Sequence, residues 1–336
     1  MKNFKIEVNP QVEMMNIILY TSKYNEICMD ILGFMPMAEI DSKYSMYVKS
    51  YFDKFLSHGI YKKIEEIVPN GFFLGRPMEF ALAISPDNYI NFKYKVSDLL
   101  IKLSGGSKSL EEIKVLFESF RESTKFEKFF YGVREYYNDS ILYLEKCLDK
   151  YPFISRLEEF YGDTNASYNF IVSNLCKGNF GINFKESNKI NIYTIYSIEN
   201  INEIVTQDSY QLCNTIFHEL SHPIVNIITE KNLNLIFKYK EAYKALILCK
   251  SEYCGYSDWE ECVNEHIIRA ISIHLSKNYF DEGQVSKRAE YDFKLGYRYI
   301  YDLLEKLKVY EDNRDKYLSF FQFYPELISV FSRKIF

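Results

Sequence analysis

The sequence has no apolar run that approaches the length of a membrane span, and no apolar segment or cleavage site follows its first residues, Met1–Lys5. We therefore expect neither a membrane protein nor a secreted one. A stripe or tail rich in lysine and arginine is also lacking. The 41 basic and 46 acidic residues are spread along the chain and give a net charge of −5, so nucleic acid is not expected as a partner.

Cysteine pairs are lacking as well. The seven cysteines are odd in number and contain no CxxC motif. This pattern indicates reduced thiols rather than a disulfide framework, and it favours a cytoplasmic protein. Cys249 and Cys254 are close in sequence, but their spacing fits no common zinc pattern, and two buried thiols are the simpler expectation.

The composition suits a large buried core. The chain has 336 residues, of which 47% are hydrophobic, and this length is slightly beyond the size at which one core usually divides. The sequence contains no internal repeat and no low-complexity tract. We therefore expect one protein with two lobes, 1–162 and 163–336.

The first of these lobes is predicted to be helical. Apolar spacing predicts helices that include Met14–Ile18, Tyr44–Phe55, Ser109–Phe120 and Phe126–Leu148. Ser104–Ser107 forms a clear break, and Ser109 with Glu112 after it matches a capping box, which marks a helix start.

The pattern changes after Gly162–Ser167. Short strand-like runs separated by turn residues follow at Asn169–Leu175, Phe180–Phe184 and Lys189–Ser197. They predict a small antiparallel or mixed sheet, arranged as a meander, that leads into a helix. An edge strand of such a sheet can bind a substrate backbone, although a purely structural sheet is the alternative. The expected class is α+β and predominantly helical.

The most specific feature is the pentapeptide His218-Glu219-Leu220-Ser221-His222, an HExxH pattern in a chain with five histidines. Apolar residues at helical spacing surround it, and Ser209 can cap the start of the helix. Histidines at i and i+4 lie on the same face of a helix, so both rings can bind one zinc ion, while Glu219 handles the proton of a water molecule. The alternative is two ordinary surface histidines on an amphipathic helix.

A catalytic zinc site requires a third protein ligand. Downstream, Ser257 with Glu260 matches a second capping box, and the helix is expected to end near Leu275. Glu265 is the predicted ligand, because a carboxylate beside Ile267 and Ile268 is costly to bury without a cation or metal.

Glu261, Glu265 and Arg269 are spaced four apart and share one face of this helix. Arg269 is expected to orient Glu265 or to stabilise charge on the substrate. Glu261 is the main competitor as ligand, followed by His266 and then Glu260. The simpler alternative for Glu265 and Arg269 is an exposed ion pair.

Pro223 departs from the expected pattern, because it directly follows the second histidine. Proline inside a helix removes a backbone donor and clashes with the carbonyl four residues earlier. A kink between Glu219 and Pro223 is therefore expected, and it would change the direction of His222.

The chain resembles an uncharacterised bacterial family, a domain of unknown function whose members are similar to gluzincin-type HExxH zinc metallopeptidases. The resemblance extends over most of the chain, and its residues are Phe217–His222, Val225-Asn226, Glu265, Arg269-Ala270, Val12–Met15, Tyr44, Phe52, His58 and Gly178–Gly181. It implies a zincin-like catalytic part, with His218, His222 and Glu265 as zinc ligands and Glu219 as the base.

The predicted function is hydrolysis of peptide bonds by zinc-activated water, with one Zn²⁺ ion and a peptide or protein as substrate. Arg269, His274 and one of the C-terminal tyrosines, such as Tyr297, are candidates for stabilising the oxyanion. Asn226 is a candidate for contacting His222, and an exposed polar position is the alternative. Two alternatives stay open: a catalytically inactive binding protein with a zincin fold, and a helical structural protein whose HExxH is coincidental. The sequence does not distinguish endopeptidase from exopeptidase action, and it does not give the oligomeric state.

Overall fold

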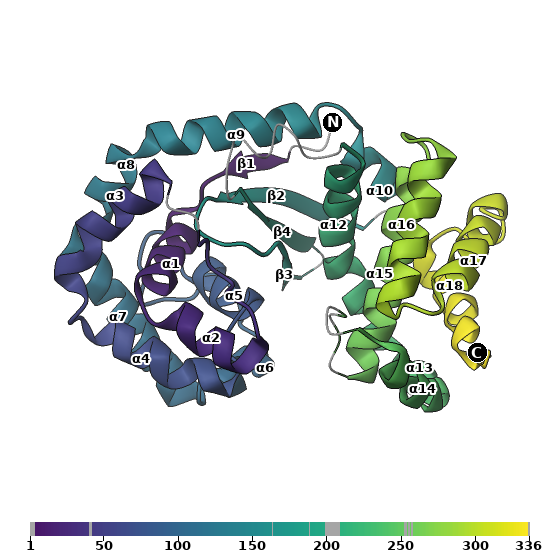
Figure 1. The fold of residues 1–336 in the computed structure, drawn as a ribbon, viewed down its shortest axis with the longest axis horizontal. Helices are drawn as coiled ribbons and strands as arrows, with labels where there is room; N and C mark the ends of the chain where they lie inside the picture. Colours follow the sequence, from purple (N-terminus) through teal and green to yellow (C-terminus); the bar gives the residue numbers. More distant parts are fainter. Residues whose placement is uncertain are drawn as a thin grey trace. The chain divides into compact units, whose positions relative to one another are not determined.

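The computed structural model describes residues 4–39, 42–162, 164–187, 189–198, 209–251, 254, 256 and 258–334. Helices dominate these residues and a four-stranded sheet accompanies them (Figure 1). The predicted α+β class with mostly helical structure is thus confirmed. Within the described part of the chain, no helix combines the length and the apolar character needed to cross a membrane.

The chain divides into two compact units, which are Met1–Asp149 with Ala166–Thr206 and Lys150–Asn165 with Gln207–Phe336. These limits differ from the predicted lobes 1–162 and 163–336. The reason is strand pairing. Strand β1 (Lys5–Glu7), near the N-terminus, pairs with β2 (Ala166–Ser173), so the sheet joins the N-terminal helices.

The sheet of the first unit has the strand order β1-β2-β4-β3, with β3 at Phe180–Glu186 and β4 at Lys189–Ser197. The three predicted strands are confirmed, but their arrangement as a meander is wrong. β2 pairs in parallel with β4, while β3 pairs with β4 in antiparallel orientation and forms the edge. β2 and β4 are the two inner strands, and the residues of β4 from Asn191 to Tyr196 are all buried, as expected for a strand covered on both faces.

Helices of the first unit surround this sheet: α9 packs on β1 and β2, and α5 packs on β3. The helices of this unit are α1 (Pro10–Thr21), α2 (Tyr24–Leu32), α3 (Lys43–Phe52), α4 (Gly59–Ile67), α5 (Gly75–Ala83), α6 (Asp98–Leu103), α7 (Ser107–Thr124), α8 (Phe126–Gly132) and α9 (Arg134–Leu148). Short 3₁₀ turns follow α3 and α4 at Asp53–Phe55 and Val68–Asn70. The helices predicted around Met14–Ile18 and Tyr44–Phe55 are confirmed.

Two predicted helix limits are wrong. α7 begins at Ser107 instead of Ser109, because Gly106 precedes it with φ of 97°, a conformation that favours glycine. The single helix predicted over Phe126–Leu148 is two helices, since Val133, with φ of −108° and ψ of 11°, leaves the helical conformation between α8 and α9.

A buried carboxyl group lies within the helical core of this unit. The Tyr44 hydroxyl donates a hydrogen bond to Glu13 Oε1 and lies 3.0 Å from the hydroxyl of Tyr137. Burial raises the pKa of Glu13 from 4.5 to about 7, against the opposing effect of the hydrogen bond from Tyr44. Glu13 therefore keeps its proton in the folded protein at a pH where the unfolded chain has lost it.

This difference predicts a pH-dependent stability. The folded state binds more protons than the unfolded state between pH 4.5 and about 7, so the free energy of unfolding falls as pH rises through that window, by about 3 kcal/mol at most. Glu13→Gln, which stays neutral, should remove this part of the slope in denaturant titrations at several pH values. Glu26→Gln, at an exposed site on α2, should retain it, and an unchanged slope in Glu13→Gln would contradict the assignment.

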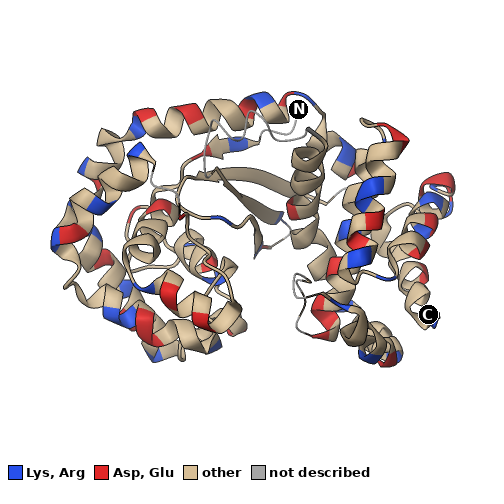
Figure 2. Ribbon diagram, viewed as in Figure 1, with Lys and Arg blue, Asp and Glu red and all other residues tan. Residues whose placement is uncertain are grey.

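The second unit is helical in all its described elements. These are α10 (Phe153–Tyr161), α12 (Ser209–Lys231), α13 (Leu233–Ile236), a 3₁₀ turn at Phe237–Tyr239, α14 (Glu241–Cys249), α15 (Trp259–Ser276), α16 (Glu282–Leu295), α17 (Ile300–Asp312), α18 (Phe320–Leu327) and a 3₁₀ turn at Ile328–Ser332. α15 is central and packs against α12, α16 and α17. Both α16 and α17 carry acidic and basic residues along their length (Figure 2).

Candidate metal centre

Helix α12 carries the HExxH pentapeptide and is buried on almost all sides. Apart from Lys231 at the end of the helix, the described side chains that are not fully buried form one stripe with helical spacing: Gln211, Thr215, His218, His222, Asn226 and Glu230. Both histidines therefore lie on the one face of α12 that is open, away from the apolar residues that pack it into the core. The helix begins at Ser209 itself.

Helix α15 carries the predicted third ligand. It starts one residue later than expected, because the Asp258 side chain accepts a hydrogen bond from the backbone N–H of Glu261 at 2.9 Å. The predicted cap, Ser257, lies outside the described residues. Within α15 only Glu260, Glu261, Glu265 and Arg269 are not fully buried, and the last three share one face.

The two stripes face each other in an antiparallel helix pair. Asn214 donates a hydrogen bond to Ser272 at 3.1 Å, and His222 lies beside Glu265, so the chain directions of α12 and α15 are opposite. This pairing brings together His218, His222 and Glu265, whose ligand atoms all lie within 4.8 Å of one another.

The distances fit a single zinc ion. His222 Nε2 lies 3.0 Å from His218 Nε2 and 3.3 Å from Glu265 Oε1, and His218 Nε2 lies 4.0 Å from Glu265 Oε2. Ligand atoms at ordinary zinc distances in a tetrahedron are about 3.3 Å apart. Two imidazoles and one carboxylate are also a donor set of catalytic zinc sites, in which a fourth position stays open.

The surroundings of both imidazoles favour their neutral form. Burial lowers the pKa of His218 well below its usual value, and the neighbouring His222, Arg269 and Arg288 lower it further. Burial also lowers the pKa of His222, although Glu265 and a hydrogen bond with the Asn226 side chain oppose this. A neutral imidazole is the form that binds a metal. Asn226 is itself exposed, so it is a polar surface position whose side chain also acts on His222.

Glu265 is held by a chain of charged side chains. Arg269 Nε lies 3.3 Å from Glu265 Oε2, and Arg269 Nη1 donates to Asp292 Oδ1 at 3.0 Å. Asp292 accepts a second hydrogen bond, from Arg288 Nε, at 3.0 Å. The Arg269 guanidinium also lies over the ring of Tyr297, 4.1 Å from its centre. The contact between Arg269 and Glu265 is an ion pair, and the hydrogen bond of Arg269 to Asp292 favours an orienting role for Arg269.

The sequence left open that these histidines, or the pair Glu265 and Arg269, lie exposed on the surface, and the burial of their side chains bears on both alternatives. The side chains of His218 and Glu265 are each 14% exposed, and that of Arg269 is 16% exposed. These values are low for surface histidines or for a solvated ion pair.

The competing ligands lie elsewhere. Glu261 is exposed, and neither it nor Glu260 belongs to the cluster. His266 is buried among aromatic rings, and its Nδ1 lies 2.7 Å from the carbonyl oxygen of Cys262. Burial lowers the pKa of His266 to about 4, as expected for a core histidine.

Two of the candidates for oxyanion stabilisation are engaged in other contacts. His274 Nε2 pairs with Glu311 at 2.8 Å, and nine residues of helix place it about 13.5 Å along the axis from Glu265. Tyr297 is completely buried, with its ring under Arg269. Neither side chain is open to a substrate at the cluster.

Glu219 and Pro223 lie on α12 among the ligands. Glu219 follows His218 directly and is 9% exposed, so its carboxylate is in a largely desolvated environment. α12 continues through Pro223 to Lys231, although proline has no N–H to donate to the carbonyl of Glu219. The two histidines converge in spite of the proline.

Asp292 and Arg288 were not predicted as part of the site. Both lie on α16, four residues apart, in a helix that carries other charged residues of both signs. That spacing is common on exposed helices, yet Asp292 is completely buried. Only the packing of α16 on α15 shows that this aspartate supports Glu265 through Arg269.

Asp292→Asn should weaken zinc binding. An amide has one oxygen, so its NH₂ group would face a guanidinium donor, and Arg269 would hold Glu265 less firmly. We expect the zinc dissociation constant to rise about 10- to 100-fold in competition with a chelator. Glu290→Gln, which removes an exposed ion pair with Lys294 on the same helix, is the matched control and should bind zinc as the wild type does. Equal affinities in both variants would show that Asp292 does not support the site.

The chain belongs to the family described as "Domain of unknown function (DUF4932)", whose model matches residues 4–330. No curated protein and no solved structure matches the chain significantly.

Proposed function

Because this family has no assigned function, we propose from the geometry of the site that the protein is a zinc-dependent hydrolase of peptide bonds. One zinc ion would be held by His218, His222 and Glu265. The observation that carries this proposal is the convergence of these three ligand atoms, two from α12 and one from α15, within 4.8 Å. Helix α12 also bears Glu219 beside the first histidine.

Each residue has a distinct role in this proposal. Bound zinc supplies Lewis-acid polarisation of the peptide carbonyl and lowers the pKa of a water molecule. Glu219 accepts the proton of the attacking water and transfers it to the leaving amine. Arg269, fixed between Glu265 and Asp292, keeps the Glu265 carboxylate in position, and Asn226 does the same for His222.

We also propose a zincin-like catalytic part of gluzincin type. It is supported by the order of the parts: an HExxH helix, then a glutamate on a second helix that packs against it in antiparallel orientation. Binding of substrate along a strand edge stays a prediction. A cytoplasmic location is supported by the seven cysteines, all of which are free thiols. The proposed partner is a peptide or protein substrate, and nucleic acid is not expected.

The proposed activity can be tested with a library of quenched fluorescent peptides. Protein loaded with one equivalent of zinc should cleave members of the library, and removal of zinc by a chelator should stop cleavage, which then returns when zinc is added back. Absence of cleavage by fully zinc-loaded protein would contradict the proposal and would favour a zincin-fold binding protein.

A further inference from the structure

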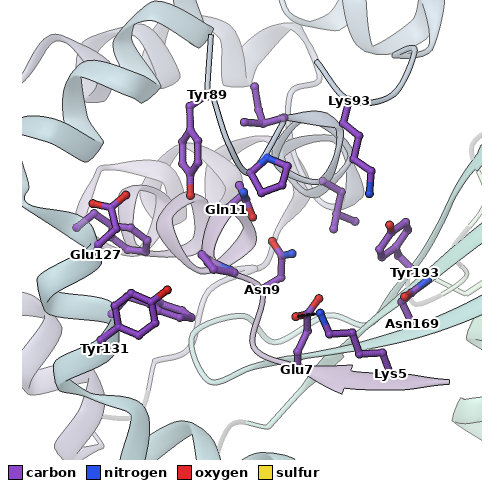
Figure 3. Close-up of a pocket in the computed structure, with 16 residues that line it drawn as sticks. Lys5, Glu7, Asn9, Gln11, Tyr89, Lys93, Glu127, Tyr131, Asn169 and Tyr193 are labelled. Atoms are coloured by element: carbon purple, nitrogen blue, oxygen red, sulfur yellow. Dashed lines mark ion pairs between the residues drawn. The ribbon is translucent and has the colours of Figure 1, made fainter. Parts of the chain in front are cut away.

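A cavity of about 400 Å³ lies in the first unit, apart from the residues of the metal centre (Figure 3). Its walls come from the segment before and at the start of α1, the end of α5 with the loop after it, α8, and strands β2 and β4. Sites for small molecules have volumes of about 300–1,000 Å³, so this cavity suits a ligand near the lower end of that range.

Two buried polar side chains in its wall have no partner in the described protein. Gln11 and Tyr89 are each 4% exposed, yet neither the Gln11 amide nor the Tyr89 hydroxyl forms a hydrogen bond with a described residue. Figure 3 shows both groups directed toward the same space. Both groups face the open space of the cavity, so their hydrogen-bonding capacity is available to a polar ligand.

Neighbouring side chains add further free hydrogen-bonding groups. Asn9 uses its Oδ1 to cap α1 at the N–H of Val12, at 3.1 Å, which leaves its Nδ2 for a ligand. Asn169 donates from its Nδ2 to the carbonyl of Ile192 at 3.1 Å, which leaves its Oδ1. The cavity thus offers both donors and acceptors, as a molecule with several hydroxyl groups requires.

The four ionised side chains that line the cavity are Lys5, Lys93, Glu7 and Glu127, so the lining carries no net charge, but Lys93 is not paired with a carboxylate of any described residue. Glu7 pairs with Lys5 at 2.6 Å, and Glu127 pairs with Arg121 at 2.5 Å. Lys93 lies over the ring of Tyr94, 4.7 Å from its centre. The N-terminus of α1, which begins at Pro10, adds partial positive charge.

Aromatic side chains complete the walls. In Figure 3, Tyr89 and Tyr131 border the cavity on one side and Tyr193 on the other, with Lys93 on the side of Tyr193. The Tyr89 ring is fixed by stacking on Phe117, with 5.8 Å between ring centres. Flat aromatic surfaces next to convergent polar groups are typical of small-molecule sites.

We propose that this cavity binds a small hydroxylated anion of about monosaccharide size, a sugar phosphate or a sugar carboxylate, with its anionic group at Lys93 and its hydroxyl groups at Gln11, Asn9 and Tyr89. The site uses none of the residues of the metal centre and is independent of the proposed hydrolase activity.

Calorimetric titration of the full chain tests this proposal with four probes: glucose 6-phosphate, glucuronate, glucose and inorganic phosphate. One of the two sugar anions should bind with a stoichiometry of one and at least about tenfold more tightly than glucose or phosphate. A sugar anion contacts both Lys93 and the side chains that bind hydroxyl groups, whereas glucose lacks the anionic group and phosphate lacks the sugar hydroxyls. The preferred anion then identifies the phosphate or the carboxylate as the group bound at Lys93.

Lys93→Met and Gln11→Leu should each weaken that binding about tenfold. Lys95→Met, which removes an exposed lysine two residues away that does not line the cavity, is the matched control and should leave it unchanged. Lys93 is itself exposed, so its variant tests the site even if Gln11→Leu fails to fold. Failure of both sugar anions to bind, equal binding of glucose, or binding that is the same in Lys93→Met would overturn the proposal.

Discussion

The Glu219→Gln variant is expected to bind one zinc ion as tightly as the wild type and to hydrolyse peptides at least about 10²- to 10⁴-fold more slowly, the usual contribution of a general base. Glutamine has the shape of glutamate, so α12 and the positions of His218 and His222 should persist. It cannot accept the proton of the attacking water, however. The measurement is the rate of cleavage of a good library peptide, together with zinc content.

Glu230→Gln is the matched control, because Glu230 lies on the same open stripe of α12 and is exposed. It should retain both zinc and activity. If Glu219→Gln retained wild-type activity with zinc bound, Glu219 would not be the base. If Glu219→Gln lost zinc instead, the substitution would have disturbed the helix. Glu219→Asp would then be used to test the role of this residue.

The Glu265→Ala variant is expected to lose zinc. Only the two imidazoles of the cluster would then remain as zinc ligands. The affinity for zinc should therefore fall by more than the 10- to 100-fold that is usual when a residue supporting a ligand is removed. Arg269 would also lose one of its two carboxylate contacts while staying largely buried, which costs stability. Glu265→Gln keeps the volume of the side chain and separates the effect on zinc from the effect on folding.

Glu261→Ala tests the main competitor, one helical turn earlier and exposed. It should retain zinc at unit stoichiometry. If Glu265→Ala retained zinc and Glu261→Ala lost it, Glu261 would be the third ligand. If both variants retained zinc, the metal would bind outside this cluster.

Site residues that are close together in the sequence could be predicted, because their relative positions follow from the geometry of a single helix. Histidines at i and i+4 share a helix face in any helix, so His218 and His222 needed no knowledge of tertiary structure. Glu265 followed from the cost of a carboxylate in an apolar stretch of helix. The antiparallel packing of α12 on α15, which brings these residues together, is a long-range property that local spacing does not contain.

Features that depend on long-range contacts could not be predicted. The short strand Lys5–Glu7 has no distinctive pattern and exists because it pairs with β2. β4 lies between β2 and β3 in the sheet. The turn residues between the strands predict where the strands end, but not the order in which they pair. Asp292 belongs to an ordinary amphipathic helix until α16 packs against α15 and buries it.

The central claim is that His218, His222 and Glu265 bind one zinc ion, and the most direct test is the metal content of the full chain purified without added metal. Elemental analysis should find zinc close to one equivalent in the wild type and a large loss in Glu265→Gln. An absence of metal from a folded wild-type protein that also fails to take up added zinc would contradict the claim. So would iron in place of zinc, because the same donor set also suits ferrous iron.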